Sequence, residues 1–147
     1  MAPLPANRAD VLHGFEAGMS LVRTLLLAGR HVGIQASAAA AEEFFPGLLQ
    51  EARGFLGRGG QLRLLAVGAV GPDFTALLAD AGVAGRTLDE GRDFGYFVTD
   101  REAAFWPLEQ PRDSPLQEVT VHVRDPAFLA HLWLAFERAW ERGRPLA

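Results

Sequence analysis

The sequence contains neither cysteine nor lysine. Without cysteine the chain has no disulfides, no thiolate zinc sites and no cysteine nucleophile. All 14 basic residues are arginine, so a lysine nucleophile, a lysine Schiff base and a lysine phosphate clamp are excluded too. The four histidines are dispersed, and none forms with a glutamate the paired spacing of a helical metal site. We therefore expect no metal and no cofactor.

Long hydrophobic runs are also missing. The run from Leu25 to Ala28 is far shorter than the roughly 20 residues that a membrane-spanning helix needs. The first residues carry no basic stretch followed by an apolar one, so we expect no signal peptide. These features predict a cytoplasmic protein that makes no contact with a membrane.

The composition is that of a folded globular protein. Of the 147 residues, 49% are hydrophobic and 22% are charged, which is sufficient for one domain with a core. The net charge is −4, so no overall positive field attracts nucleic acid. From this balance we expect nucleic acid to be an unlikely partner.

Apolar periodicity and breaker residues predict helices that alternate with strands. The helices are expected from a cap at Asp10 to Gly29, over residues 45–56 with Pro46 in the first turn, from Pro72 to Gly82, and after Asp125. The strands are expected at residues 31–37, 61–67, 83–87 and 119–123, with a hairpin over residues 92–106.

This order predicts a single α/β domain over residues 1–147, with residues 1–8 flexible. We expect a three-layer sandwich around a mixed sheet. The first half is predicted to be parallel, through right-handed crossovers, and the second half to add antiparallel hairpin strands.

The hairpin is the most informative stretch. Residues 92–101 read as a buried strand that runs into an acidic turn at Asp100, and a second apolar run, residues 103–106, follows. The end of a buried strand is a natural place for a ligand or for chemistry, so the polar residues there decide what the domain can do.

Several segments together suggest a family. They are the runs LLLAGRHV (residues 25–32) and GRGGQLRLL (residues 57–65), Leu77 to Gly82, and the closing pattern of Phe136, Trp140 and Pro145-Leu146. From Val11 onward the chain resembles the phospholipase D-like fold, in the non-catalytic form of the effector domains of TrmB-type and some LuxR-type transcriptional regulators. The resemblance implies transcription regulation, a small-molecule effector or a regulatory protein as partner, and a homodimer. No helix-turn-helix is predicted, so such a regulator would act through another protein.

Catalytic members of this superfamily carry a His-x-Lys-x-x-x-x-Asp motif on the hairpin. Aligning its aspartate with Asp100 places Asp93 at the histidine position and Gly95 at the lysine position. A carboxylate repels phosphate and glycine offers no cation, so the resemblance implies a pseudoenzyme. Aspartate is also a residue type that tight turns favour, so Asp100 has a structural explanation as well.

If catalysis is lost but the scaffold is kept, we expect a ligand cleft at the strand ends. The predicted ligand-binding residues are Ser37, Asp93, Tyr96, Asp100 and Trp106, which combine two aromatic rings with a few polar groups. The alternative is that both rings pack beneath helices.

Two other functions stay open. One is a hydrolase that uses Asp93 and Asp100 at the same cleft by another mechanism. The other is nucleic-acid binding through Arg58, Arg63, Arg92 and Arg101, which the acidic balance disfavours.

Overall fold

The computed structural model describes residues 9–89, 94–107 and 119–146. Asp93 and Arg92 therefore lie outside the described residues. The rest of the predicted hairpin, residues 94–106, lies within them.

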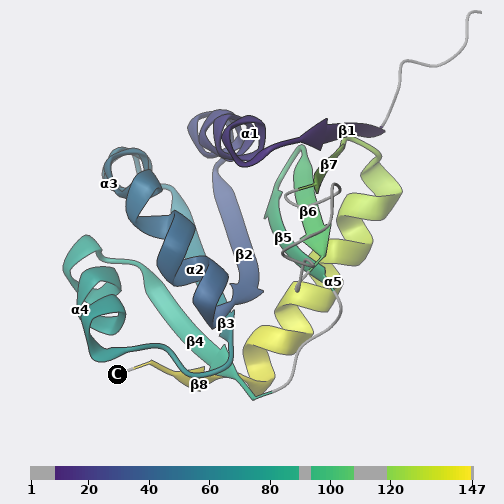
Figure 1. Ribbon diagram of the computed structural model, residues 1–147. Coiled ribbons are helices and arrows are strands. Elements are labelled where there is room, and N and C mark those ends of the chain that lie inside the picture. The colour runs from purple at the N-terminus through teal and green to yellow at the C-terminus, as the bar shows by residue number, and fades with distance from the viewer. Residues whose placement is uncertain (1–8, 90–93, 108–118, 147) are drawn as a thin grey trace, which may run out of the picture.

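One sheet of eight strands organises the molecule (Figure 1). β2, β3 and β4 run parallel to one another, and every other neighbouring pair is antiparallel. In spatial order the strands are β1 (Ala9–His13), β7 (Val119–Val123), β6 (Ala103–Pro107), β5 (Phe94–Thr99), β2 (His31–Ser37), β3 (Gln61–Val67), β4 (Ala84–Leu88) and β8 (Arg144–Pro145). The predicted α/β class, with a parallel half and an antiparallel half in one mixed sheet, is confirmed.

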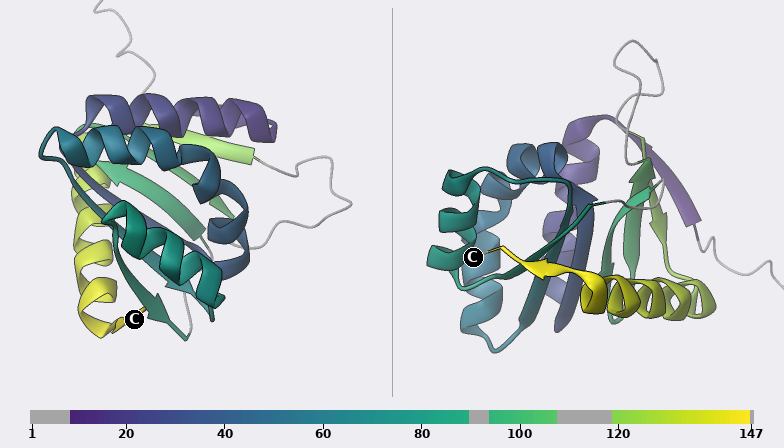
Figure 2. Two further views of the ribbon diagram at one scale, coloured as in Figure 1. Left: turned by 90° about the vertical axis from the view of Figure 1, so that its left-hand side faces the viewer. Right: turned by 90° about the horizontal axis from the view of Figure 1, so that it is seen from below.

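Helices cover both faces of this sheet and give three layers (Figure 2). α5 (Pro126–Arg142) lies alone on one face, against β5, β2 and β4. The opposite face carries α1 (Phe15–Ala28), α2 (Ala38–Phe44), the 3-10 helix η1 (Phe45–Leu48), α3 (Leu49–Gly57) and α4 (Pro72–Ala81). Among the described residues, no helix has the length and apolar content that crossing a bilayer requires.

Two helices begin where local chemistry predicts. Asp125 accepts a hydrogen bond from the Phe128 amide at 3.0 Å, and Pro126 occupies the first turn of α5. α4 likewise begins with Pro72 and ends at Gly82, whose φ of 79° is left-handed and therefore favours glycine.

The first predicted helix begins too early. Asp10 caps no helix: it lies in β1, which pairs with β7, and α1 begins only at Phe15. Gly14, with a φ of 96°, turns the chain between strand and helix. The apolar residues from 12 to 26 fit a helical period, but a strand pairing with distant β7 overrides the local pattern.

The second predicted helix is divided. Ser37 caps α2, which ends at Phe44, and the chain continues as η1 before α3 starts at Leu49. Pro46 lies in the first turn of η1, where its missing amide breaks the α-helical hydrogen-bond ladder. The apolar face predicted for residues 45–56 nevertheless packs as expected, since Phe45, Leu48, Ala52 and Phe55 are all buried.

Candidate functional site

The turn of the β5–β6 hairpin is organised by Thr99. Its hydroxyl oxygen accepts from the amides of Arg101 and Glu102 at 3.1 and 3.0 Å, and the hydroxyl donates to the Glu102 carbonyl. Within the turn, the Asp100 carboxylate lies 3.9 Å from Nε of its neighbour Arg101. The same carboxylate accepts from the Arg30 amide at 2.9 Å, which ties the hairpin to the start of β2.

The environment of Asp100 favours its charged form. Burial by itself raises the pKa of this carboxyl, but the backbone amides of Arg30, Asp100 and His31 and the charge of Arg101 lower it below its usual range. Asp100 therefore behaves as an anchored carboxylate at the amino-terminal end of β2.

The alignment of Asp100 with the motif's aspartate predicts that Gly95 takes the lysine position. The indole of Trp106 fills the space beside Gly95. The two residues are directly paired across β5 and β6. A Cβ added at Gly95 would lie 2.5 Å from Trp106 Nε1, 2.8 Å from Cε2 and 3.0 Å from the Gln35 carbonyl oxygen. Trp106 itself packs edge-on against Phe44, with ring centroids 6.0 Å apart. Any longer side chain at Gly95 must therefore displace a packed aromatic ring.

Tyr96 points to the opposite face of the sheet, because successive residues of a strand alternate. It is 5% exposed and packs edge-on against Phe136 of α5. Its hydroxyl donates to Gln35 Oε1 at 3.1 Å, which satisfies a side chain that is itself buried. Tyr96 and Trp106 consequently line no common space; each ring packs beneath a different helix.

The predicted ligand-binding residues occupy separate places. Ser37 accepts from the Ala40 amide at 3.2 Å as the cap of α2, at the same end of the sheet as Trp106. Asp100 lies beyond the other end of β5, a strand that spans roughly 20 Å at about 3.3 Å per residue. Tyr96 lies on the other face, and Asp93 is not described. The structure thus brings Ser37 and Trp106 to one end of the sheet, whereas Tyr96 and Asp100 lie elsewhere.

The arginines of the predicted basic group do not form one cluster. Arg63 is committed to Glu137 and lies over the Phe136 ring at 5.0 Å from its centroid. That hydrogen bond lowers the pKa of Glu137, against a smaller opposing effect of burial. Arg63 is thus removed from the predicted basic group, and Arg92 lies outside the described residues.

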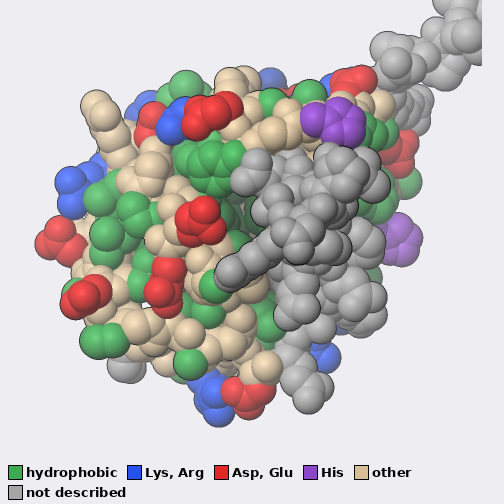
Figure 3. All heavy atoms as spheres, viewed as in Figure 1, with side chains coloured by type: hydrophobic (Ala, Val, Ile, Leu, Met, Phe, Trp, Pro, Cys, Tyr) green, Lys and Arg blue, Asp and Glu red, His purple; other side chains and the backbone are tan. Residues whose placement is uncertain are grey.

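Three other arginines gather at the amino-terminal edge of β2 and β3. Arg30 precedes β2, Arg58 follows α3 and bonds the Leu27 carbonyl, and Arg101 lies in the hairpin turn that Asp100 joins to Arg30. All three are exposed. We call them the arginine edge. On the face shown in Figure 3, by contrast, acidic side chains, arginines and apolar side chains are interspersed.

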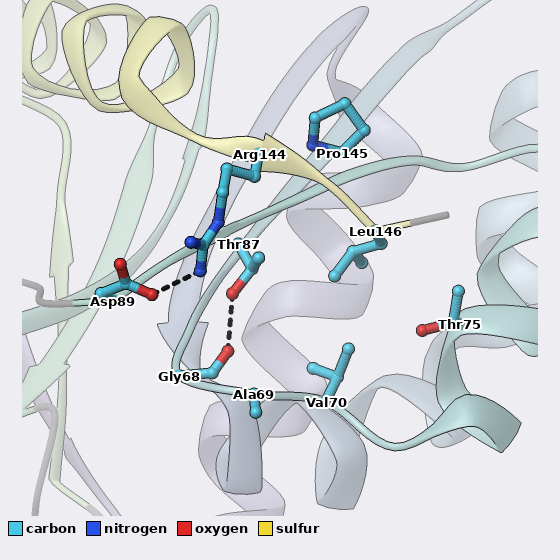
Figure 4. A pocket seen from close by; sticks show the side chains of 9 residues that line it. All are labelled: Gly68, Ala69, Val70, Thr75, Thr87, Asp89, Arg144, Pro145 and Leu146. Atoms are coloured by element: carbon cyan, nitrogen blue, oxygen red, sulfur yellow. Dashed lines mark hydrogen bonds and ion pairs between the residues drawn. The ribbon is translucent and has the colours of Figure 1, made fainter.

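A cavity of about 250 Å³ lies at the opposite edge, where the parallel strands β3 and β4 end (Figure 4). Its lining comes from the loop after β3, the start of α4, the end of β4 and the C-terminal residues: Gly68, Ala69, Val70, Thr75, Thr87, Asp89, Arg144, Pro145 and Leu146. Sequence reasoning missed it, because Asp89 and Arg144 are 55 residues apart. The available signal was its position, since ligands of α/β proteins bind outside the carboxyl ends of parallel strands.

No family model matches this chain, and no curated protein matches it in sequence. Solved structures do. TrmBL2, an archaeal chromatin protein described as showing a novel mode of DNA binding, aligns with a TM-score of 0.73 and 17% identity over 95% of this chain. The match covers 54% of TrmBL2, so the chain spans about half of that protein's length.

Two further structures match along nearly their whole length. Nuc from Salmonella typhimurium, a phospholipase D family member, aligns with a TM-score of 0.66 and 16% identity, covering 93% of this chain and 97% of Nuc. NucT from Helicobacter pylori aligns with a TM-score of 0.72 and 9% identity, covering 93% of this chain and 98% of NucT. The chain therefore has the phospholipase D-like fold, as its resemblance to TrmB-type domains implied.

One expectation is wrong. Nucleic acid was held to be an unlikely partner on the strength of the acidic net charge. TrmBL2, whose fold this chain shares, is described as binding DNA. Neither the fold nor a net charge of −4 therefore argues against nucleic acid, and local arrangements such as the arginine edge must be considered instead.

Proposed function

We propose that this chain is a non-catalytic phospholipase D-like domain, a regulatory or sensory module that works by binding a small-molecule effector or a protein partner. The observation that carries the proposal is the pairing of Gly95 with Trp106. On the motif alignment, the residue at the cation position of the family's catalytic members is a glycine in this chain, and an indole ring occupies the space beside it.

The chemistry supports the loss of activity. Phosphodiester cleavage by the family's mechanism needs a nucleophile and a cation that stabilises charge on the phosphoryl oxygens. The chain has no lysine at all, and a glycine at residue 95 offers no cation. The other reading, a hydrolase with two carboxylates, is disfavoured because Asp100 is anchored at the far end of β5 from Gly95.

The test is an activity assay on bis(p-nitrophenyl) phosphate, p-nitrophenyl phosphate and single-stranded DNA, with and without Mg²⁺, Mn²⁺ or Zn²⁺. We expect no turnover above buffer. Metal-dependent turnover that survives repurification and is abolished by Asp93→Asn would overturn the proposal and establish the hydrolase reading. Asp80→Asn serves as the matched control, since it removes an exposed carboxylate on α4 that neither reading uses.

Pairing with a second copy belongs to this proposal, because effector domains of the kind that the sequence resembles act as dimers. Sedimentation equilibrium should show a dimer at high protein concentration. A strict monomer throughout the accessible range would contradict this part of the proposal.

A second candidate function, nucleic-acid binding, is favoured by the arginine edge. Three exposed guanidinium groups on one edge can each neutralise a phosphate, and the release of their counterions makes the affinity fall with salt. Fluorescence anisotropy on duplex DNA should then give a log–log salt slope near −3, from about 0.9 per contact.

Charge-matched variants separate this candidate from non-specific attraction. Substituting Arg30, Arg58 and Arg101 with glutamine should flatten the salt slope to near zero. Substituting Arg53, Arg138 and Arg142, which lie away from this edge, should leave the slope in place. Equal effects of the two triple variants would contradict a site at the arginine edge.

A further inference from the structure

The cavity at the carboxyl edge is walled by two segments that lie far apart in the sequence. One wall is the loop Gly68–Gly71 that leads into α4. The other is the C-terminal strap, which we define as residues 143–146 (Figure 4). Neither segment takes part in the hairpin that carries Gly95, so the cavity is separate from the family's catalytic position.

The C-terminal strap is docked by defined contacts. β8 pairs with β4, placing Arg144 opposite Thr87, and the Leu146 amide donates to the Gly85 carbonyl at 3.3 Å. Leu146 fills the space above Gly85, where an added Cβ would lie 2.6 Å from its Cδ1. The cavity thus exists only while the strap lies on the sheet.

The polar groups of the cavity are both donors and acceptors, since the Asp89 carboxylate accepts from Arg144 and the Thr75 hydroxyl donates to the Gly71 carbonyl. The Thr87 hydroxyl donates to the Gly68 carbonyl at 2.6 Å, which uses its hydrogen. The backbone amides of Ala69 and Val70 have no acceptor among the described residues. The cation is Arg144, and Figure 4 shows its guanidinium reaching across to Asp89, at 2.5 Å.

The Arg144–Asp89 pair is easily exchanged. The side chains are 66% and 76% exposed, and ion pairs of this kind contribute little in water. Asp89 is held by one hydrogen bond, from Arg144 Nη2 to Oδ1. An incoming carboxylate carries the same charge and can form two parallel hydrogen bonds with the guanidinium. A doubly charged phosphate is less suitable, because Asp89, Asp73 at the start of α4 and Glu42 on the Gly71 amide surround the loop with negative charge.

The remaining lining sets the size and polarity of the ligand. Val70, Pro145 and Leu146 are apolar, and Figure 4 shows Val70 and Leu146 on opposing walls. A volume of about 250 Å³ corresponds to about eight water molecules at roughly 30 Å³ each. The matching ligand is a monocarboxylate with a short branched apolar tail.

We propose that this cavity binds a small aliphatic monocarboxylate through Arg144, and that the bound molecule holds the C-terminal strap against the sheet. This gives the small-molecule effector a site and a chemical class, and in that respect it rests on the proposed function. A negative result here leaves the hydrolysis assays unaffected, and the two proposals fail separately.

The first experiment titrates the full chain with isovalerate and follows amide chemical shifts by NMR. With about seven non-hydrogen atoms, isovalerate should bind with a dissociation constant on the order of 1 mM. We expect saturable shifts at Thr75, Thr87 and Leu146. Isovaleramide, which has the same shape without the charge, should produce none at the same concentrations. Equal binding of the amide, or no saturable shift with isovalerate up to about 50 mM, would overturn the proposal.

Two variants and a control test the role of Arg144. Arg144→Gln should weaken isovalerate binding by about tenfold or more, whereas Arg138→Gln, on the exposed side of α5, should leave it unchanged. Asp89→Asn removes the competing carboxylate and should retain or tighten binding. Loss of binding in Asp89→Asn, or unchanged binding in Arg144→Gln, would contradict the assignment. The amide spectrum of each variant reports whether it is folded.

The effect on the C-terminal strap is measured by hydrogen exchange of the Leu146 amide. A ligand that binds only the docked strap slows this exchange by a factor of one plus the ratio of its concentration to its dissociation constant. At a ligand concentration ten times the dissociation constant, the exchange should be about elevenfold slower. Exchange that isovalerate leaves unchanged, while shifts at Thr75 saturate, would overturn the coupling to the strap.

Discussion

Gly95→Ala is the sharpest perturbation of the candidate site. The new methyl group would lie 2.5 Å from Trp106 Nε1, so the indole must retreat by about 1 Å to reach ordinary contact distance. It cannot retreat freely, because Phe44 lies against it. Overpacking of this kind costs about 1–3 kcal/mol. At this chain length each kcal/mol lowers the melting temperature by roughly 2–4 °C.

The same change should become harmless once the ring is removed. In a Trp106→Ala background, the two shortest contacts of the methyl group at residue 95 are gone, and the Gln35 carbonyl oxygen follows at 3.0 Å. There we expect its cost to fall below about 0.5 kcal/mol, so the two substitutions couple by about 1–2 kcal/mol. Urea unfolding of wild type, both single variants and the double variant measures this coupling directly.

Gly57→Ala is the matched control. A Cβ at Gly57 meets no atom within 4 Å, and the residue lies in α3, so alanine there should stabilise the fold by up to about 1 kcal/mol. If Gly95→Ala is as well tolerated as Gly57→Ala, or if its cost is the same with and without Trp106, then the indole does not fill the lysine position.

Three further predictions concern stability. Asp125→Ala removes the acceptor for the Phe128 amide and should cost about 1 kcal/mol, measured by urea unfolding. Tyr96→Phe removes the donor to buried Gln35 Oε1 and should cost about 1–3 kcal/mol; a change below about 0.3 kcal/mol would show that Gln35 finds another partner. Because the folded-state pKa of Asp100 is lowered, its contribution to stability is present above the unfolded pKa of about 4 and is lost as the pH falls through the lower folded value. Asp100→Asn should therefore reduce the steepness of acid destabilisation, and an unchanged slope would contradict the anchoring by Arg30.

The architecture was predictable because its signals are local. The strands at residues 31–37 and 61–67 are short apolar runs bounded by glycine, and α4 and α5 carry their own proline and capping residues. β1 was not predictable in this way. Its five residues also fit a helical period, and only their pairing with β7, distant in the chain, decides between the two.

The candidate site was predictable in part. The absence of a cation at residue 95 follows from the sequence, but the ring that fills its space does not, since Trp106 is placed there by strand register. Register also puts Tyr96 on the other face. The cavity at the carboxyl edge depends on β8, two residues whose pairing with β4 no local pattern indicates.

The position of β1 also has a kinetic consequence. Asp10 and Arg124, which join β1 to the end of β7, are separated by 114 residues. β2, β3 and β4 can pair as soon as their crossover helices form, whereas β1 is made first and must wait for β7. Closing so long a loop is slow and entropically costly. During synthesis β1 should therefore stay unpaired until β7 has been made, and in the finished protein its pairing should be among the first to open.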